Sequence, residues 1–462
     1  MTDRLGLTAQ EHMGFWWLPE DPDRTVGGRL SFAPADGLRL DLVGVLGSDD
    51  PYEKLDVVLG TTIDGEPITL ESVQRGGRRT VSSIRLPATV ISETLHPQFG
   101  YVGGHLPSPD QRTFATAILG LDDLAGWMGT RPFEEDFGPE PVRFSVSYQH
   151  PAVVRAEADF GEIEISHSAG VFGDGLHERG LRASVAFVVR LREPRGIDWW
   201  LQRIVRALQD LLTLVADRPS SVTRLAFVGE AGDIAVLYEP AGPDHLGRPL
   251  YHHEFLFHPA EVAEQMPTIL ARWFELTTEL APVVDFLIAT RYRPSYVENR
   301  FLNVVSALEA YHRRRYPNAV LPKAEHDVRQ ARILGAVSEE DRNWLSERLA
   351  YSNEPSLRSR LGDLLGRGNN DFLRAILGSD DLIKPCVDLR NRLIHQDPRR
   401  SRTAVEPSAL WSVTEKLTLL LLTCLLDDLG FSGPQLHEVI VGSARFRQLV
   451  EADRWARGAR RR

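Results

Sequence analysis

The feature that most constrains this fold is a change in the spacing of apolar residues along the chain. Up to about residue 258 the apolar residues come in short runs, often at every second position, between Gly, Asp and Pro. Beyond that residue they recur every three or four positions over long stretches. A period of two fills one face of a β-strand, whereas a period near 3.6 fills one face of a helix. The pattern therefore predicts an α+β multidomain protein, β-rich first and all-helical afterwards.

Short strands separated by turn residues predict an antiparallel, sandwich-like arrangement for the N-terminal part. The strand over 181–191 has the clearest alternation, which would place its apolar side chains on one face: Leu181, Ala183, Val185, Phe187, Val189 and Leu191. One helix, 199–215, interrupts the strands. The other expected strands are 28–32, 38–46, 57–62, 68–73, 81–86, 142–148, 162–166, 224–228, 234–238 and 254–257.

The helical pattern of the C-terminal part predicts a bundle. At 462 residues the chain is too long for one ordinary core. We expect a β-rich sensor or regulatory region over 1–290, which could form two lobes at 1–150 and 151–290, and a helical domain over 291–462. The expected helices are 260–271, 296–315, 324–334, 339–351, 356–365, 371–377, 380–396 and 408–429.

Cysteine usage and apolar runs predict the compartment. The two cysteines, Cys386 and Cys424, lie in apolar helical stretches and form neither a disulfide framework nor a CxxC zinc signature. The N-terminus has no apolar run of signal-peptide length, and the longest apolar run, 417–426, is about half of what a bilayer needs. We expect a cytoplasmic protein that does not contact membranes.

Charge is distributed unevenly between the two parts. The whole chain has a net charge of −11, yet residues 291–462 contain 29 basic against 22 acidic residues, a net of +7. The first 290 residues therefore have a net charge of −18. The basic part could meet a polyanion or the acidic part of its own chain, and a split of this kind also arises partly by chance.

The segment 379–400, SDDLIKPCVDLRNRLIHQDPRR, is the best candidate for a chemical site. Its apolar residues form one helical stripe at spacings of four, three and four: Leu382, Cys386, Leu389 and Leu393. Asn391 and His395 are four residues apart and lie nearly opposite that stripe, and Arg390 lies between stripe and polar face. These residues alone fit a solvated helix face, with a histidine that suits the helix dipole, as well as they fit a catalytic site.

The string LRNRLIH resembles the HEPN signature, in which an arginine is followed after four residues by a histidine and has a polar neighbour, commonly asparagine. In the helix 296–315, Glu309 and Arg313, followed by Arg314, resemble the Glu and basic-dyad pattern of that group. Residues 353–365, NEPSLRSRLGDLL, resemble its segment between the middle helices. The long apolar helix 408–429 completes the expected bundle.

A second resemblance covers the N-terminal part. Residues 14–44, GFWWLPEDPDRTVGGRLSFAPADGLRLDLVG, resemble the N-terminal domain of ApeA-type anti-phage proteins, which pair this domain with a C-terminal HEPN domain. The aromatic residues Phe15, Trp16 and Trp17 in this stretch either pack in the core or recognise a ligand.

The resemblance implies metal-independent RNA cleavage at a dimer interface, without a cofactor. His395 would act as general base on the ribose 2′-OH or as general acid on the leaving oxygen, which leaves 2′,3′-cyclic phosphate ends. Arg390 would stabilise phosphorane charge, and Asn391 would orient His395 or the phosphate. Glu309 would hold Arg390 or Arg313, unless it only forms an intrahelical salt bridge.

The implied partners are RNA, with tRNA suggested by family analogy, a second copy bound through the HEPN domain, and a phage-derived trigger. Two alternatives remain. One is a catalytically silent HEPN scaffold that binds RNA or a partner, and the other is a β-rich ligand sensor whose helices only dimerise. A metal site in residues 251–258, YHHEFLFH, would need further ligands from elsewhere.

Overall fold

The structure is a computed structural model that describes residues 6–48, 50, 54–81, 90–138, 143–242, 248–292, 295–367, 377, 379–395 and 406–459. The chain forms two compact units that divide between Ala271 and Arg272, with residues 253–256 grouped with the second unit. The first unit is β-rich and the second is helical, so the predicted α+β fold is confirmed. The division precedes the boundary expected near 291, because α5 (Ala281–Tyr292) packs on α6 (Val297–Arg315) of the helical unit.

The first unit contains antiparallel strands in one continuous hydrogen-bonded order and one separate hairpin. Its strands are β1 (Gln10–Leu18), β2 (Asp21–Ala33), β3 (Gly37–Val43), β4 (Leu55–Thr62), β5 (Pro67–Val81), β6 (Val90–Val102), β7 (Phe114–Leu121), β8 (Phe133–Gly138), β9 (Arg143–Tyr148), β10 (Val154–Ala158), β11 (Gly161–Phe172), β12 (Gly180–Arg195), β13 (Val222–Val228) and β14 (Asp233–Leu237).

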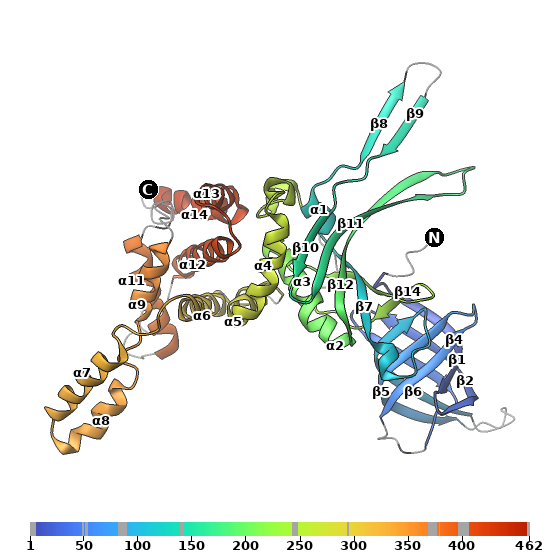
Figure 1. The fold of residues 1–462 in the computed structure, drawn as a ribbon, viewed down its shortest axis with the longest axis horizontal. Helices are drawn as coiled ribbons and strands as arrows, with labels where there is room; N and C mark the ends of the chain where they lie inside the picture. The colour runs from blue at the N-terminus through green and yellow to red at the C-terminus, as the bar shows by residue number, and fades with distance from the viewer. Residues whose placement is uncertain are drawn as a thin grey trace. The chain divides into compact units, whose positions relative to one another are not determined.

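The strands β1–β6 close into a barrel (Figure 1). Their order is β6-β3-β2-β1-β4-β5, and the pairing of β5 with β6 completes the ring. The other edge of β6 pairs with β3 at residues 92–95 and with β14 at residues 100–102. One long strand therefore joins the barrel to a second sheet, ordered β14-β13-β7-β12-β11-β10.

The barrel core shows how the aromatic stretch of β1 is used. Trp16 is completely buried, whereas Phe15 is 57% exposed, because neighbouring residues of a strand point to opposite faces. The indole ring of Trp16 lies against the backbone of Gly60 on β4, where a Cβ atom would overlap the ring. Trp17 lies outside the core and contacts His105 edge-on at 5.2 Å between ring centroids. Trp16 is therefore a core residue.

The second sheet is covered by a helical stretch that comprises α2 (Ile197–Trp199), a π-helical segment (Trp200–Val205) and α3 (Arg206–Ala216). Trp200 donates a hydrogen bond from its indole nitrogen to the carbonyl oxygen of Phe114, at 3.1 Å. The ring of Phe114 stacks on Phe227 with centroids 4.0 Å apart. The short helix α1 (Leu124–Met128) packs against α3.

Most expected strands are present with shifted ends, and β1, β6, β7, β8 and β10 are additional. The strand expected at 254–257 is wrong: a 3-10 turn occupies His252–Glu254, and no strand follows it. The rings of His252 and His258 stack at 3.5 Å, and a hydrogen bond of 2.8 Å joins the His258 ring to the His252 carbonyl oxygen. This contact holds the segment in a turn. Most of the expected strand 81–86 lies outside the described residues.

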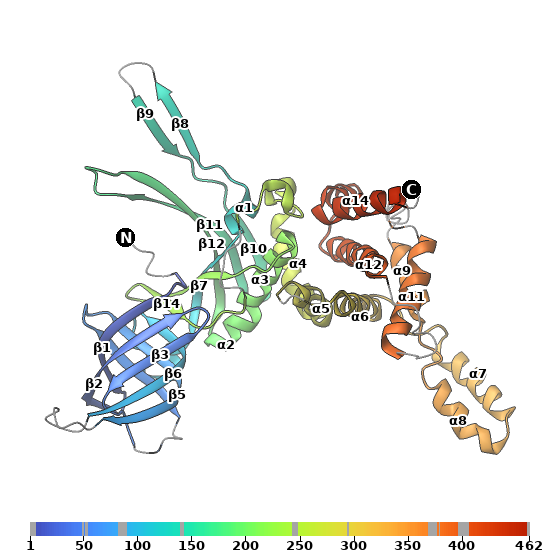
Figure 2. The same cartoon turned by 180° about the vertical axis from the view of Figure 1, so that it is seen from behind.

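The helical unit confirms most of the expected helices (Figure 2). The helix expected at 260–271 instead begins at Met266, after a 3-10 turn at Pro259–Val262, and the helix expected at 371–377 falls largely outside the described residues. Besides α5 and α6, the helices are α4 (Met266–Glu279), α7 (Lys323–Gly335), α8 (Glu339–Leu349), α9 (Leu357–Leu365), α11 (Ser379–His395), α12 (Pro407–Asp428), α13 (Gly433–Gly442) and α14 (Ala444–Ala459).

The apolar helix α12 forms the centre of the helical unit. The helix has 22 residues, and its most apolar 18-residue window has a mean hydropathy of 1.5, so it is long and apolar enough to cross a membrane. However, 78% of its most apolar window is buried inside the structure, and it packs against α6, α11, α13 and α14. Such burial is what a core helix needs.

The contact between Trp16 and Gly60 gives a stability prediction. Gly60→Ala would force a methyl group into the Trp16 ring, and we expect it to lower the free energy of unfolding of the barrel by about 2 kcal/mol, because overpacking displaces neighbours. Gly27→Ala on β2 is the control, since a Cβ there meets nothing within 4 Å. Hydrogen exchange of the β1 and β4 amides measures the difference. Equal protection in both variants would contradict the proposed packing.

Candidate active site

The three candidate catalytic residues lie in the last two turns of α11. Arg390 donates a hydrogen bond from Nη1 to Oδ1 of Asn391, at 3.4 Å, and Asn391 is exposed. His395 is the last residue of α11, and its side chain lies outside the described part of the structure. The residues that precede this face anchor the helix, since Leu382 and Cys386 are completely buried. The predicted separation of an apolar face from a polar one is therefore present for these residues.

The thiol of Cys386, which lies one helical turn before Arg390, is influenced by charged residues of both α6 and α11. Burial raises the pKa of its thiol to about 12, the carboxylate of Glu309 raises it as well, and the guanidinium of Arg390 lowers it. Glu309 on α6 and Arg390 on α11 therefore act on the same thiol, and α6 contacts α11 directly. The fold brings a candidate supporting carboxylate and a candidate catalytic arginine into one neighbourhood.

The other candidate supporting residue, Arg313, has a partner on a different segment. Its Nη2 lies 3.0 Å from Oε2 of Glu354, which precedes α9. An intrahelical pair with Glu309 was the expected alternative, but Arg313 pairs across to Glu354 instead. Because both side chains are partly exposed, the pair itself adds little stability.

A buried polar cluster beside these residues was missed by the sequence analysis. Its centre is His312 on α6, which is 1% exposed. The Nδ1 atom of His312 accepts a hydrogen bond from Nη1 of Arg360 at 3.0 Å, and Nε2 lies 2.9 Å from Oδ2 of Asp363. A guanidinium can only donate, so Nδ1 carries no proton and Nε2–H donates to Asp363. The two partners thereby fix one neutral tautomer of His312.

Arg360, on α9, holds the remaining members of the buried polar cluster. It is 2% exposed, and its Nη2 donates to Oδ1 of Asn318 at 2.6 Å and to Oε2 of Glu354 at 3.3 Å. Burial lowers the pKa of Arg360, as does the positive charge of Arg313, while nearby carboxylates including Glu309 raise it. Two buried residues, His312 and Arg360, and three more exposed ones on α6, α9 and the segments beside them thus form one network: His312, Asn318, Glu354, Arg360 and Asp363.

The sequence contained a partial signal for this cluster. His312 directly precedes Arg313, and the other ion-pair members, Glu354, Arg360 and Asp363, all fall in the stretch 353–365 that resembles HEPN proteins. Sequence periodicity cannot assign these roles, because they depend on how α6 and α9 meet. A buried histidine between two helices has no distinct spacing.

Several arginines of the helical unit are used for internal pairing. Arg367 contacts Asp427 and Asp428, each at 2.6 Å. Arg315 contacts Asp428 and Glu279, each at 2.8 Å. The number of basic residues in the helical unit therefore overstates the number of cations that are available to a polyanion.

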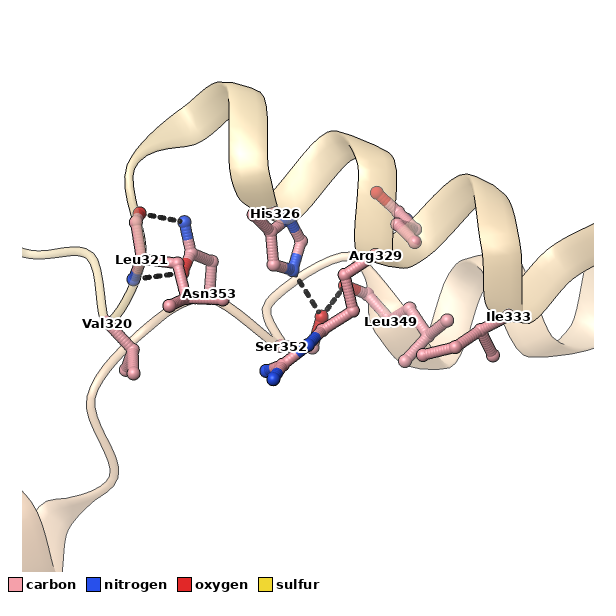
Figure 3. Close-up of a pocket in the computed structure, with 9 residues that line it drawn as sticks. Val320, Leu321, His326, Arg329, Ile333, Leu349, Ser352 and Asn353 are labelled. Carbon is pink, nitrogen blue, oxygen red and sulfur yellow. Dashed lines mark hydrogen bonds between the residues drawn. The ribbon is translucent and has the colours of Figure 1, made fainter.

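A small pocket of about 110 Å³ lies at the base of the α7–α8 hairpin (Figure 3). Asn353 closes it on one side, because its amide group hydrogen-bonds both the N–H and the C=O of Leu321, at 2.9 and 3.0 Å. His326 contributes Nε2, which lies 2.9 Å from Oγ of Ser352. The pocket is too small for a nucleotide, since ligand sites usually exceed roughly 300 Å³. Its contacts hold the base of the hairpin in place.

No metal centre is formed by the residues that the structure describes, since they contain no group of three or more His, Cys, Asp or Glu side chains with suitable geometry. In the segment YHHEFLFH, the two ring nitrogens of His258 face the carbonyl oxygens of Trp127 and His252, at 2.7 and 2.8 Å. This histidine is committed to backbone contacts.

Comparison with known proteins gives two family matches. Residues 11–273, more than half of the chain, match the family model for ApeA N-terminal domain 1. Residues 302–435 match the model for the Apea-like HEPN domain. Searches of the curated proteins and of the solved structures gave no significant match.

The buried polar cluster gives a second stability prediction. Arg360→Met would leave the buried Nδ1 atom of His312 without its donor, and we expect it to destabilise the helical unit by about 2 kcal/mol. Arg358→Met on the exposed side of α9 is the matched control and should stay within about 0.5 kcal/mol of the parent. Hydrogen exchange of the α6 and α9 amides provides the measurement. A cost at Arg360 no larger than at Arg358 would mean that the cluster does not hold these helices together.

Proposed function

This chain belongs to the ApeA family, with an N-terminal ApeA domain and an ApeA-like HEPN domain, and from that premise we propose that it is an RNA-cleaving effector of bacterial anti-phage defence. HEPN domains are generally ribonucleases, so the family assigns nuclease activity to the chain at the coarse level. The observation that carries the finer proposal is the hydrogen-bonded pair of Arg390 and Asn391 on α11, in the helix that ends at His395.

The proposed reaction is attack of a ribose 2′-OH on the adjacent phosphorus. His395 accepts the 2′-OH proton, the new O2′–P bond forms, and the P–O5′ bond breaks as the leaving oxygen takes up a proton from a second acid. The products are a 2′,3′-cyclic phosphate and a 5′-hydroxyl. Because the nucleophile belongs to the RNA itself, this chemistry requires no metal ion and does not act on DNA.

The side chains beside His395 fit the charges of that reaction. Arg390 stabilises the negative charge that develops on the phosphorane oxygens, since a guanidinium donates two parallel hydrogen bonds to phosphate. Asn391, hydrogen-bonded to Arg390, orients the scissile phosphate or His395. Glu309 would restrain Arg390, since both charges act on the buried thiol of Cys386, and Arg313 would be positioned by Glu354.

We propose that two copies join through their HEPN domains, so that two α11 helices face one composite cleft and two His395 side chains supply base and acid. The proposed substrate is tRNA in the cytoplasm, and a phage-derived trigger acts on the β-rich unit. No membrane takes part. The competing function is a HEPN domain that binds RNA or a partner without cutting, and the next experiment separates the two.

Total tRNA is incubated with the purified protein and with His395→Ala in EDTA, and the RNA ends are analysed. We expect cyclic-phosphate ends and a loss of at least about 100-fold in rate for the variant, the usual contribution of a general acid or base. Arg390→Ala should lose a similar factor, as donors to a developing oxyanion do. Arg392→Ala, two residues along the same helix, is the matched control and should retain the parent rate.

Three outcomes would contradict the enzymatic proposal. Cleavage that is equal in His395→Ala would assign the activity to another site or to a contaminant. Cleavage that EDTA abolishes would contradict the metal-independent reaction. RNA binding by the parent without cleavage, in the presence of lysate from infected cells as a source of the trigger, would favour the scaffold function.

The dimer has its own test. Sedimentation equilibrium should give a mass near twice the 51.8 kDa of the chain, and the specific cleavage rate should fall on dilution below the dimer dissociation constant. A monomer that cleaves with a rate independent of dilution would contradict the composite site, while leaving the roles of Arg390 and His395 intact.

A further inference from the structure

Two hairpins of the first unit extend beyond its core (Figures 1 and 2). One is the β8–β9 hairpin, in which the two strands pair with each other and, among the described strands, with no other. The other is formed by the outer halves of β11 and β12, whose register continues from Gly161 opposite Leu191 to Phe172 opposite Gly180. We call these two hairpins the projecting arms.

In the arm formed by β11 and β12, the apolar face of the strands continues beyond the part that is covered by the core. The alternation of β12 gives one apolar face, and its inner residues Phe187 and Val189 are completely buried. The outer residues of the same face, Leu181 and Val185, are only half-buried. Val171, opposite Leu181, is 57% exposed. The sequence therefore builds an apolar stripe of which the fold covers only half.

The β8–β9 arm carries a cluster of aromatic residues on one face, where the exposed Glu135 also lies, opposite Val146. Strand register places Phe133 opposite Tyr148 and Phe137 opposite Phe144, and the ring centroids of these pairs are 5.8 and 4.9 Å apart. Phe137 is 73% exposed and Phe144 is 55% exposed. Val146 continues the same face.

The exposed aromatic residues of the β8–β9 arm indicate that it binds a partner. An isolated two-stranded hairpin is marginally stable in water, and clustered exposed aromatic residues usually mark an interaction site. Both outer edges of the hairpin also have backbone N–H and C=O groups that no described strand pairs with. An extended polypeptide can add to such an edge as a further strand.

The two arms share one base. The Nε2 atom of His150, which follows β9, lies 3.1 Å from the carbonyl oxygen of His167 on β11. The rings of His150 and Tyr148 contact edge-on with centroids 6.1 Å apart. A ligand bound to one arm at this base is therefore within reach of the other.

Charge selects the kind of ligand. Residues 133–148 contain four acidic residues and one basic residue, and Glu134, Glu135 and Asp136 are all exposed. A surface of this sign repels nucleic acid and anionic membranes, and it attracts a cationic partner. Together with the aromatic face, it fits a polypeptide in which apolar and basic residues alternate.

We propose that the projecting arms are the docking surface for an extended segment of a partner protein that is apolar on one face and cationic on the other. The segment pairs with an edge of the β8–β9 hairpin and covers the aromatic face. This inference goes beyond the proposed ribonuclease function, because the binding requires neither RNA nor catalysis.

The test uses the full-length protein and a fluorescein-labelled peptide of alternating valine and lysine, with the corresponding valine and glutamate peptide as comparison. Anisotropy should show binding of the lysine peptide at least about tenfold more tightly than of the glutamate peptide. The double variant Phe137→Ser with Phe144→Ser should lose about tenfold or more, as expected for aromatic anchors. Phe15→Ser, an equally exposed aromatic of the barrel, is the matched control and should bind as the parent does.

A second variant separates charge from the aromatic face. Glu134→Lys with Asp136→Lys should weaken binding of the lysine peptide and strengthen binding of the glutamate peptide. Equal binding of both peptides, or unchanged binding by the double Phe variant, would overturn the proposal. A concentration-dependent dimer that only the double Phe variant lacks would also overturn it, because the arms would then serve self-association. Circular dichroism confirms folding of each variant.

Discussion

The buried guanidinium of Arg360 on α9 donates hydrogen bonds both to neutral acceptors and to a carboxylate. These hydrogen bonds fix the position of α9 against α6. Arg360 reaches His312, Asn318 and Glu354, all of which lie on α6 or in the segments beside α9. A buried cation is costly unless each of its donors finds an acceptor. The observed placement of the two helices supplies acceptors on both sides of this guanidinium. Because α9 and α6 both contact α11, the position of Arg390 follows from this placement.

The N-terminal unit relies on a different constraint, the double use of β6. One edge of β6 pairs with β5 along its length. The other edge pairs with β3 over one half and with β14 over the other. The barrel is thereby closed and continuous with the second sheet. Closure leaves the barrel no free edge, so the unpaired edges of the unit occur elsewhere, notably at the β8–β9 hairpin. The unpaired edges of the β8–β9 hairpin are therefore close to its exposed aromatic residues.

The sequence predicted the fold class and the family, and it predicted the helix that bears the candidate catalytic residues. These predictions succeeded because they depend on periodicity and on a local string, which need no knowledge of tertiary contacts. The barrel was not predicted, because closure depends on the β5–β6 pairing between residues that alternate like those of an open sheet. His312 and Arg360 were missed for the same reason, since their partners are distant in sequence. The strand expected at 254–257 failed because the His252–His258 contact overrides local alternation.

The internal pairing of arginines has a consequence for how the helical unit meets a polyanion. Arg315 and Arg367 form salt bridges with carboxylates of the same unit: Asp427, Asp428 and Glu279. Binding of nucleic acid releases condensed counterions in proportion to the number of cations that actually touch phosphates. Arginines that are paired with carboxylates of their own unit contribute little to this release. The dependence of RNA binding on ionic strength would then be weaker than the number of arginines and lysines alone suggests, and shape and the local α11 surface would contribute alongside long-range attraction.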